Sequence, residues 1–176
     1  MKWLQELRAL GIEPVMLTGD NETAAQYVAR QVGITTIFGG LLPEEKGGKI
    51  KELLSRYQAV AMVGDGINDA PALAQSTVGI AMGAAGSDTA IETANIALMN
   101  DNLSLIPHLI RLSRKTVRTI QTNTIGAIAV KVIFITLAIA GYSNLVLAIA
   151  ADVGVTLVVI LLSLRLGAYS PKNSNH

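Results

Sequence analysis

Residues 63–71 read Val63-Gly64-Asp65-Gly66-Ile67-Asn68-Asp69-Ala70-Pro71 and come directly after an apolar run. The apolar run predicts a strand and Ala70-Pro71 predicts a helix start, so this loop belongs at the carboxyl end of a strand. Ligands of open α/β sheets bind at that edge. Two carboxylates and an amide on a glycine-hinged loop suit a hard cation such as Mg²⁺, held together with phosphate oxygens. The alternative for a Gly-Asp-Gly loop is a simple turn.

The chain on both sides of this loop alternates helical stripes with short apolar runs. Such alternation is typical of an α/β layer with a largely parallel sheet, and it predicts one compact unit. We expect strands over Pro14–Leu17, Thr35–Phe38, Ala59–Val63, Val78–Met82 and Asn95–Leu98. Helix starts are marked by Asp20-Asn21, by Pro43 before Glu44-Glu45, and by Ser87-Asp88.

Two further polar stretches fall at comparable sheet edges. Leu17-Thr18-Gly19-Asp20 follows the first expected strand, and Leu42-Pro43-Glu44-Glu45-Lys46 opens a later helix. A hydroxyl and an ammonium can both bind a transferring phosphoryl group, because catalysis of that transfer depends on positioning and charge neutralisation. The alternatives are an N-cap role for Thr18 and a solvated helix charge for Lys46.

The composition averages two unlike parts of the 176-residue chain. It is 51% hydrophobic and 15% charged, but residues 1–118 carry most of the charge and residues 125–164 carry almost none. A net charge of +1 with 4% aromatic residues argues against nucleic-acid binding. The absence of cysteine excludes a disulfide framework or a thiolate metal site built from this chain alone. The chain opens with a helical stripe of four apolar residues, Trp3, Leu4, Leu7 and Leu10. This stripe lacks the long apolar core of a signal peptide, so nothing indicates secretion.

The last third of the sequence predicts a membrane hairpin. The apolar stretch Ile125–Ala140 is followed by a polar break, residues 141–144, and by Leu145–Leu164, whose 20 residues make about 30 Å of helix, one bilayer core. Positive charge flanks the outer ends of both stretches, which by the positive-inside rule places head and tail in the cytoplasm. The flanking cations are Arg111, Arg114, Lys115, Arg118, Arg165 and Lys172, and Tyr142 and Tyr169 would lie at opposite interfaces. The alternative is a pair of buried helices in a large soluble protein.

Two charged residues interrupt the apolar stretches. Lys131 lies ten residues before Gly141 and Asp152 eight after Asn144, so in an antiparallel hairpin they reach similar depth and can pair. A lone charge at the bilayer centre costs roughly 2.5 to 3.5 kcal/mol, so such a residue is a functional candidate. Lys131 can alternatively snorkel to the interface, whereas Asp152 is too short to do so. All five methionines lie outside the spans, and a carboxylate suits Zn²⁺ better than Cu(I), which disfavours copper.

Taken in order, TGDN, LPEEK and GDGINDAPAL resemble the phosphorylation domain of P-type ATPases, within the haloacid-dehalogenase-like superfamily. The resemblance implies that Thr18 and Lys46 contact the phosphoryl group on an aspartate, that Asp65 ligates Mg²⁺, and that Asn68 and Asp69 support the same site. It predicts a catalytic set of Thr18, Gly19, Asp20, Lys46 and Asn68. Of these, Thr18, Gly19 and Lys46 would also bind the phosphate, with Mg²⁺ at Asp65 and Asp69.

The stretch from Gly86 to Leu98, GSDTAIETANIAL, resembles the heavy-metal branch of that family, and its zinc/cadmium/lead group more than its copper group. Within it, Asp88 and Glu92 are better interpreted as a solvated acidic helix face. A lysine and an Asp-x-Gly in the last two helices also match this group, so Asp152 is implied at the transport site with Lys131 as its partner. The sequence departs from the group at Leu162, where an asparagine commonly stands.

The expected fold is an α/β haloacid-dehalogenase-like (Rossmann-type) partial phosphorylation domain followed by an α-helical transmembrane hairpin. Residues 1–100 would form the phosphorylation domain, 101–122 a basic linker helix, 123–167 two transmembrane helices and 168–176 a cytoplasmic tail. The family's phosphoacceptor motif, Asp-Lys-Thr-Gly-Thr, does not occur in the sequence. The nucleotide-binding domain, the actuator domain and earlier membrane helices are likewise expected outside it, so this chain alone is expected to be inactive.

The resemblance therefore implies the C-terminal fragment of an ATP-driven exporter of Zn²⁺, Cd²⁺ or Pb²⁺ that uses Mg²⁺ and ATP. Its partners would be the lipid bilayer, the divalent metal ion and the N-terminal remainder of the pump, in a plasma or inner membrane and without nucleic acid. The choice among zinc, cadmium, lead and cobalt depends on ligands outside this sequence. Two alternatives stay open: a membrane-anchored phosphatase of the same superfamily, and a truncated, non-catalytic membrane module.

Overall fold

The structure is a computed structural model that describes residues 1–65, 68–83, 92–99, 101–142 and 145–167. It divides into two compact units, Met1–Pro107 (unit 1) and His108–His176 (unit 2). The predictions that fall on the remaining residues lie outside the described residues. They concern Gly66, Ile67, the Ser87-Asp88 helix start, Tyr169 and Lys172.

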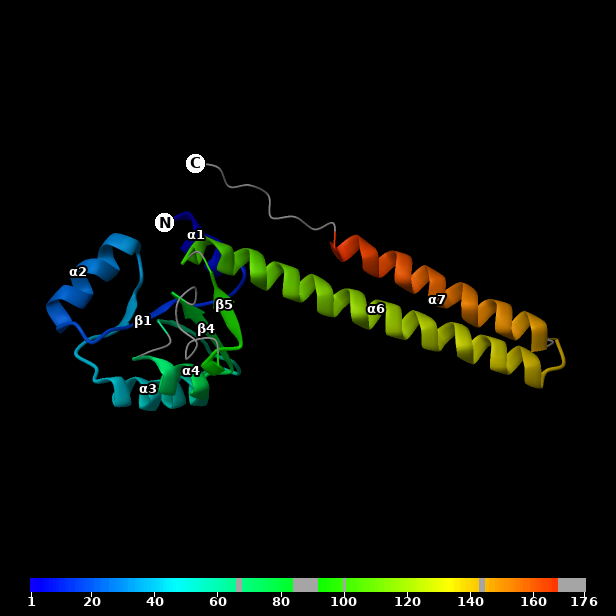
Figure 1. Cartoon of the computed structure of the whole chain (residues 1–176), viewed down its shortest axis with the longest axis horizontal. Helices are drawn as coiled ribbons and strands as arrows, with labels where there is room; N and C mark the ends of the chain where they lie inside the picture. The colour runs from blue at the N-terminus through cyan, green and yellow to red at the C-terminus, as the bar shows by residue number, and fades with distance from the viewer. Residues whose placement is uncertain (66–67, 84–91, 100, 143–144, 168–176) are drawn as a thin grey trace. The chain divides into compact units, whose positions relative to one another are not determined.

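Unit 1 alternates helices and strands along the chain (Figure 1). The helices are α1 (Lys2–Ala9), α2 (Glu22–Val32), α3 (Pro43–Arg56) and α4 (Ala70–Gln75). The strands are β1 (Val15–Leu17), β2 (Thr36–Phe38), β3 (Ala61–Gly64), β4 (Val78–Met82) and β5 (Ile96–Leu98), and the 3-10 turn η2 (Leu103–Leu105) follows. Every expected strand is present, with ends within two residues of the prediction, and the α/β fold class is confirmed.

The strands pair in parallel, but in two sheets. β1 pairs with β2, and β3, β4 and β5 form a three-stranded sheet in that order. The sequence predicted parallel strands but not this division, because apolar runs mark where a strand forms and not which strand it pairs with. Among the described residues, β1 and β3 each pair on one edge only.

Local signals explain where the helices start and stop. The Asn21 side chain accepts a hydrogen bond of 2.9 Å from the Ala24 N–H, which caps α2, and Gly33 ends that helix in the left-handed region at φ 82°. Pro43 occupies the first turn of α3, where its missing N–H costs nothing. The Glu45 carboxylate returns to accept a 2.8 Å hydrogen bond from the Leu42 N–H.

One apolar cluster joins α3, β3 and α4. Ile50, Met62, Ala72 and Leu73 are buried against one another, with Leu17, Leu54 and Val60 packed around them. The helix that carries Lys46 is therefore packed against the helix that follows Asp69. Burial of side chains of this size is worth about 1.5 to 3 kcal/mol each, so this cluster is the main attachment between these elements.

Glu13 links the end of α3 to the start of β2. Its carboxylate accepts hydrogen bonds from the Tyr57 hydroxyl at 2.7 Å and from the Thr36 hydroxyl at 3.0 Å. These two bonds, the Tyr57 bond first, lower the pKa of Glu13, and the same contact raises the pKa of Tyr57. A carboxyl group with a lowered pKa in the folded state adds stability above its unfolded pKa, about 4.3, and loses it as pH falls through the folded value.

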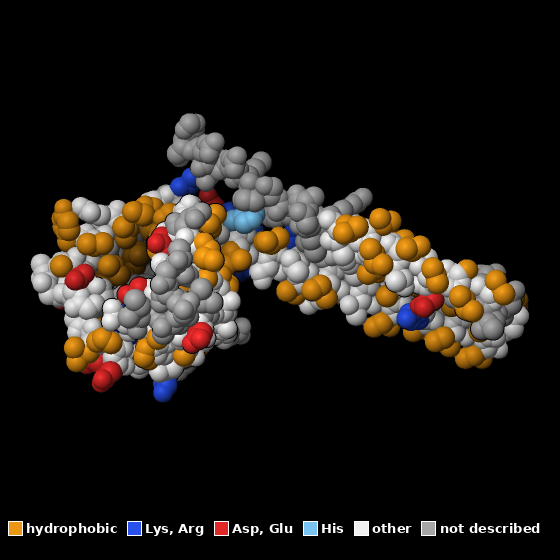
Figure 2. Space-filling model, viewed as in Figure 1, with side chains coloured by type: hydrophobic (Ala, Val, Ile, Leu, Met, Phe, Trp, Pro, Cys, Tyr) orange, Lys and Arg blue, Asp and Glu red, His pale blue; other side chains and the backbone are white. Residues whose placement is uncertain are grey.

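Unit 2 is a helical hairpin of α6 (Ile106–Ile139, 34 residues) and α7 (Leu145–Gly167, 23 residues). α6 passes from the basic residues into the apolar stretch without a break, so residues 106–122 of the expected basic linker helix and the first span form one helix. The helix from Leu103 to Ile139 is long and apolar enough to cross a membrane, and α7 contains the shorter apolar stretch Ile149–Leu164. On the face shown in Figure 2, apolar side chains are spread along the hairpin and are interrupted by a basic and an acidic side chain, and Ile139 is 84% exposed.

We expect Glu13→Gln to make the free energy of unfolding of unit 1 depend less on pH in the acid range. Wild type should lose unfolding free energy as pH falls from 6 to below about 4, whereas the variant should lose less, because the amide does not titrate. The fluorescence of Trp3, the single tryptophan, follows urea unfolding of unit 1 in detergent at each pH. Glu44→Gln, at an exposed site of α3, is the matched control and should keep the wild-type slope. An unchanged slope in the Glu13 variant would contradict the assignment.

Candidate active site and membrane ion pair

The loop after β3 carries Asp65, Asn68 and Asp69. The Asn68 N–H donates a 3.1 Å hydrogen bond to one oxygen of the Asp65 carboxylate, and its side-chain amide lies 3.4 Å from the other. Asp65 and Asn68 are both exposed, whereas Asp69 is half-buried. The Asp65 carboxylate thus lies at the surface and is contacted by Asn68 of its own loop.

Asp69 is paired with Lys46. The Lys46 Nζ lies 2.6 Å from Asp69 Oδ1, and their side chains are only 15% and 13% exposed. The pair joins the first turns of α3 to the loop after β3, so two of the predicted polar stretches meet. Reduced access of water strengthens the attraction, but each charge depends on the other to offset its desolvation. The interpretation of Lys46 as a solvated helix charge is wrong, because its ammonium is largely covered.

A glycine makes room for this pair. A Cβ placed on Gly64 would lie 2.5 Å from Asp69 Oδ2 and 2.7 Å from Asp69 Cβ. Such distances are below any real contact, so the loop brings Asp69 back over the end of β3 only because position 64 has no side chain.

The Thr18 hydroxyl stabilises the turn of the loop after β1. Thr18 Oγ1 accepts a 3.1 Å hydrogen bond from the Asp20 N–H and lies 3.1 Å from an oxygen of the Asp20 carboxylate. The N-cap of α2 is Asn21, so the alternative role of Thr18 as the helix N-cap is wrong. Thr18 instead stabilises the turn that precedes the cap.

Backbone hydrogen bonds attach this turn to the segment that leads into α3. The Leu41 N–H donates to the Thr18 carbonyl at 3.1 Å, and the Gly40 N–H donates to the Asp20 carbonyl at 2.6 Å. Gly40 has φ +66°, which favours glycine, and a Cβ on Gly19 would approach the Leu41 carbonyl to 3.3 Å. The stretch from Thr18, the start of α3 and the loop after β3 therefore form one connected set of contacts.

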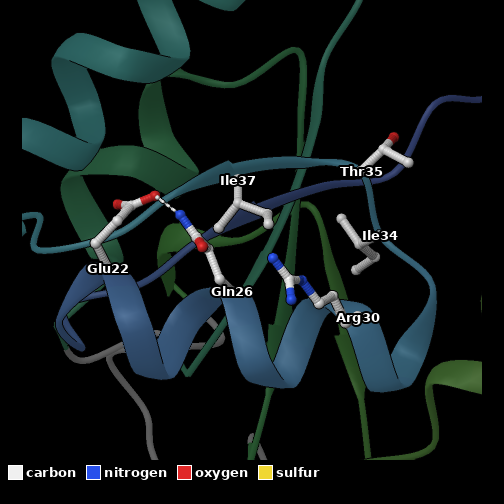
Figure 3. Close-up of a pocket in the computed structure, with 6 residues that line it drawn as sticks. All are labelled: Glu22, Gln26, Arg30, Ile34, Thr35 and Ile37. Carbon is white, nitrogen blue, oxygen red and sulfur yellow. Dashed lines mark hydrogen bonds between the residues drawn. The ribbon is translucent and has the colours of Figure 1, made fainter.

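Outside this set, a hollow of about 490 Å³ opens between α2 and β2. Figure 3 shows its lining, in which Gln26 donates a 3.2 Å hydrogen bond to Glu22. The six lining residues are Glu22, Gln26, Arg30, Ile34, Thr35 and Ile37, and none of them belongs to the predicted site. Within the described part of the chain, no group of three or more His, Cys, Asp or Glu is arranged to hold a metal ion.

In unit 2, Lys131 and Asp152 lie across the hairpin from each other. Lys131 Nζ is 3.1 Å from Asp152 Oδ1, and the two side chains are 60% and 56% exposed. One turn later, the Thr156 hydroxyl donates a 2.8 Å hydrogen bond to the Asp152 carbonyl. A second polar contact, from the Asn123 amide to the Ser163 hydroxyl at 3.1 Å, joins the same helices farther from the turn. Both contacts are compatible with the same antiparallel register of α6 and α7. Lys131 and Asp152 lie at similar positions along the hairpin and pair, as expected.

Comparison with known proteins relates these features to one family. Residues 1–77 match the model of the haloacid dehalogenase-like hydrolases. The chain is 53% identical over 164 residues to the cadmium-transporting ATPase of Staphylococcus aureus, and 46% identical over 166 residues to the zinc-transporting ATPase of a Synechocystis species. It is homologous to part of the cadmium- and zinc-transporting P-type ATPases. Both alignments cover 93% of this chain and 23% of the relative, so the chain spans about a quarter of the length of these proteins.

A solved structure gives the same result. The crystal structure of a zinc-transporting PIB-type ATPase in the E2.Pi state matches with a TM-score of 0.86 at 42% identity, over 94% of this chain and 27% of that one. The resemblance predicted from TGDN, LPEEK and GDGINDAPAL is therefore confirmed, together with its zinc/cadmium branch and the haloacid-dehalogenase-like fold of unit 1. The roles of individual residues stay predictions.

We expect Lys46→Ala to destabilise unit 1 by about 1 to 3 kcal/mol, because it leaves the Asp69 carboxylate half-buried without its ammonium. The double variant Lys46→Met with Asp69→Leu should recover part of this loss, since neither charge is then desolvated. Urea unfolding followed by Trp3 fluorescence measures both. Lys51→Ala, an exposed cation of the same helix, is the control and should change stability little. Equal losses for Lys46→Ala and Lys51→Ala would show that the pair contributes nothing.

Proposed function

We propose that this chain is part of an ATP-driven exporter of divalent heavy-metal cations such as Zn²⁺, Cd²⁺ and Pb²⁺. Unit 1 would contribute to the phosphoryl-transfer site and unit 2 would supply two membrane helices. The observation that carries the proposal is the Lys131–Asp152 ion pair within residues 125–164, which carry no other charged side chain. Charges in such a position are costly and mark an ion pathway by default.

In unit 1 we assign the phosphoryl group to Thr18, Gly19 and Lys46, with Asp20 holding the Thr18 hydroxyl in place. The reactive group would be an aspartyl phosphate formed on a segment outside this chain, and the nucleotide-binding part would lie outside it too. The three polar stretches already lie in one connected set of contacts, which supports a shared site. Catalysis of phosphoryl transfer requires this positioning above all.

Mg²⁺ fits Asp65 best. Its carboxylate is exposed and oriented by Asn68, and Mg²⁺ is commonly held by one or two carboxylates with water and phosphate oxygens completing the shell. When bound, Mg²⁺ supplies neutralisation of the phosphoryl charge. Asp69 is engaged by Lys46, so we propose that it orients the lysine and reaches the metal only if that pair opens.

In the hairpin, Asp152 would bind the transported cation and Lys131 would neutralise Asp152 when the cation is absent. A carboxylate suits Zn²⁺ and related divalent ions. More than half of each side chain is uncovered by the two helices, which leaves space for ligands from other membrane helices of the pump. Leu162, on the same helix, adds no polar ligand.

The exposed apolar surface supports a bilayer around unit 2, since patches of this extent are rare on soluble monomers. The cations in the first part of α6 favour a cytoplasmic unit 1 and C-terminus, in a plasma or inner membrane. A membrane-anchored phosphatase of the same superfamily is the weaker candidate, because the similarity to metal-transporting ATPases extends over both units.

In the complete pump we expect Asp152→Ala to abolish Zn²⁺- and Cd²⁺-stimulated ATPase activity in proteoliposomes, because the cation loses its charged ligand. Val153→Ala, the exposed neighbour in α7, is the control and should keep stimulation close to wild type. Stimulation that survives Asp152→Ala would remove this residue from the transport site.

Asp65→Ala should prevent formation of the phosphoenzyme from radiolabelled ATP in Mg²⁺, because the metal would lose its carboxylate. Unit 1 should keep its unfolding midpoint in urea, since Asp65 is exposed and lies outside the core cluster. Glu44→Gln serves again as the exposed acidic control and should label normally. Wild-type labelling of the Asp65 variant would refute the assignment.

A further inference from the structure

Four cations near the start of α6 lie on one side of the helix. Arg111, Arg114, Lys115 and Arg118 follow an i, i+3, i+4, i+7 spacing, which places them within roughly 100° of arc at 100° per residue. The last three of them are exposed. The positive-inside rule requires positive charge near the membrane, but it does not require the charges to share one side of a helix. The rule therefore does not explain why these four cations lie on one side. We call these residues the basic stripe.

The basic stripe faces away from α7. Among the described residues, Asn123 and Lys131 of α6 make side-chain polar contacts with α7, to Ser163 and Asp152. At 100° per residue, Asn123 lies roughly 130° around the helix from the midpoint of the stripe. Lys131 lies roughly 150° from the same midpoint in the opposite direction. The two described polar contacts with α7 therefore lie on the side of α6 away from the stripe.

The same side of α6 becomes apolar and exposed toward the turn of the hairpin. Ile125 and Val132 follow Arg118 at intervals of seven residues, which returns them to nearly the same side, and they are 67% and 56% exposed. One continuous surface thus carries cations at one end and uncovered apolar side chains at the other. This is the chemical pattern of a phospholipid, with an anionic headgroup above its acyl chains.

The heights along the helix agree with this pattern. If the hydrocarbon core extends about 30 Å back from Ile139, it ends near Ile120. Arg118, Lys115 and Arg114 then lie about 1 to 8 Å beyond it, which is the thickness of one headgroup layer. Arg111 lies one turn farther and within reach of the layer by its long side chain.

We propose that this side of α6 binds an anionic phospholipid of the leaflet at the N-terminal end of α6. Arg114, Lys115 and Arg118 would bind the headgroup phosphate, and the acyl chains would lie along Ile125 and Val132. The inference rests on the proposed membrane position of unit 2 but not on the transported ion or the phosphoryl site. Clusters of basic residues beside a membrane helix attract anionic lipids by about fivefold in affinity per residue.

The test uses the 176-residue chain in phosphatidylcholine vesicles with a trace of spin-labelled lipid. Electron paramagnetic resonance gives the fraction of label held at the protein, for labelled phosphatidylglycerol and for labelled phosphatidylcholine. We expect the protein to prefer phosphatidylglycerol, and the combined variant R114Q/K115Q/R118Q to weaken this preference by at least about fivefold. The variant K2Q/R30Q/K51Q removes the same charge from exposed sites of unit 1 and should keep the preference.

Further arms identify the ligand. R114K/R118K retains the charge and should retain the preference, and molar salt should reduce it because the screening length falls to about 3 Å. Competition by millimolar inorganic phosphate would overturn the proposal in favour of a free phosphate site. Equal retention of the two labelled lipids by wild type, or equal loss in both charge-matched variants, would also overturn it.

Alkaline carbonate extraction separates this inference from the proposed function. A chain that resists extraction from vesicles but does not select phosphatidylglycerol refutes the lipid site and leaves the membrane hairpin standing. A chain that carbonate removes from vesicles of both lipids refutes the membrane position and the lipid site together. Retention with selection that depends on the basic stripe supports both.

Discussion

The ion pair between Lys46 and Asp69 is the contact on which the arrangement of unit 1 depends. It joins the first turns of α3 to the loop after β3 at 2.6 Å, in a place where both side chains are largely shielded from water. The core cluster of Ile50, Met62, Ala72 and Leu73 brings these elements together. The ion pair then orients them, because neither charge is stable there without the other. The pair requires a glycine at position 64, because a side chain there would occupy the position of Asp69.

Unit 2 follows a related rule. Beyond the basic first part of α6 its helices are mostly apolar, so apolar packing alone specifies their register weakly. Two polar contacts, Lys131 with Asp152 and Asn123 with Ser163, select one antiparallel register. In hydrocarbon each of these groups would carry a large desolvation cost without its partner. The ion pair therefore aligns the hairpin, and its carboxylate is the group that we propose as a ligand of the transported cation.

Much of unit 1 could be predicted because its signals are local. Apolar runs identified the five strands, and Asn21 and Pro43 marked the starts of α2 and α3. The same reasoning did not reveal that the strands form two sheets, because strand pairing depends on residues distant in sequence. The basic segment and the first span form one helix, because no glycine or proline lies between Arg111 and Ile125 to end it.

The sequence by itself determined the types of element, the three polar stretches with their resemblance to P-type ATPases, and the presence of one acid and one base within residues 125–164. Only the tertiary structure decided which of these groups meet. It pairs Lys46 with Asp69, turns the Thr18 hydroxyl back onto Asp20, and directs the basic stripe of α6 away from α7. The physical reason is that motifs and periodicity are properties of neighbouring residues, whereas a partner 23 residues away is selected by the packing of α3 on α4 and by the burial that makes an unpaired charge costly.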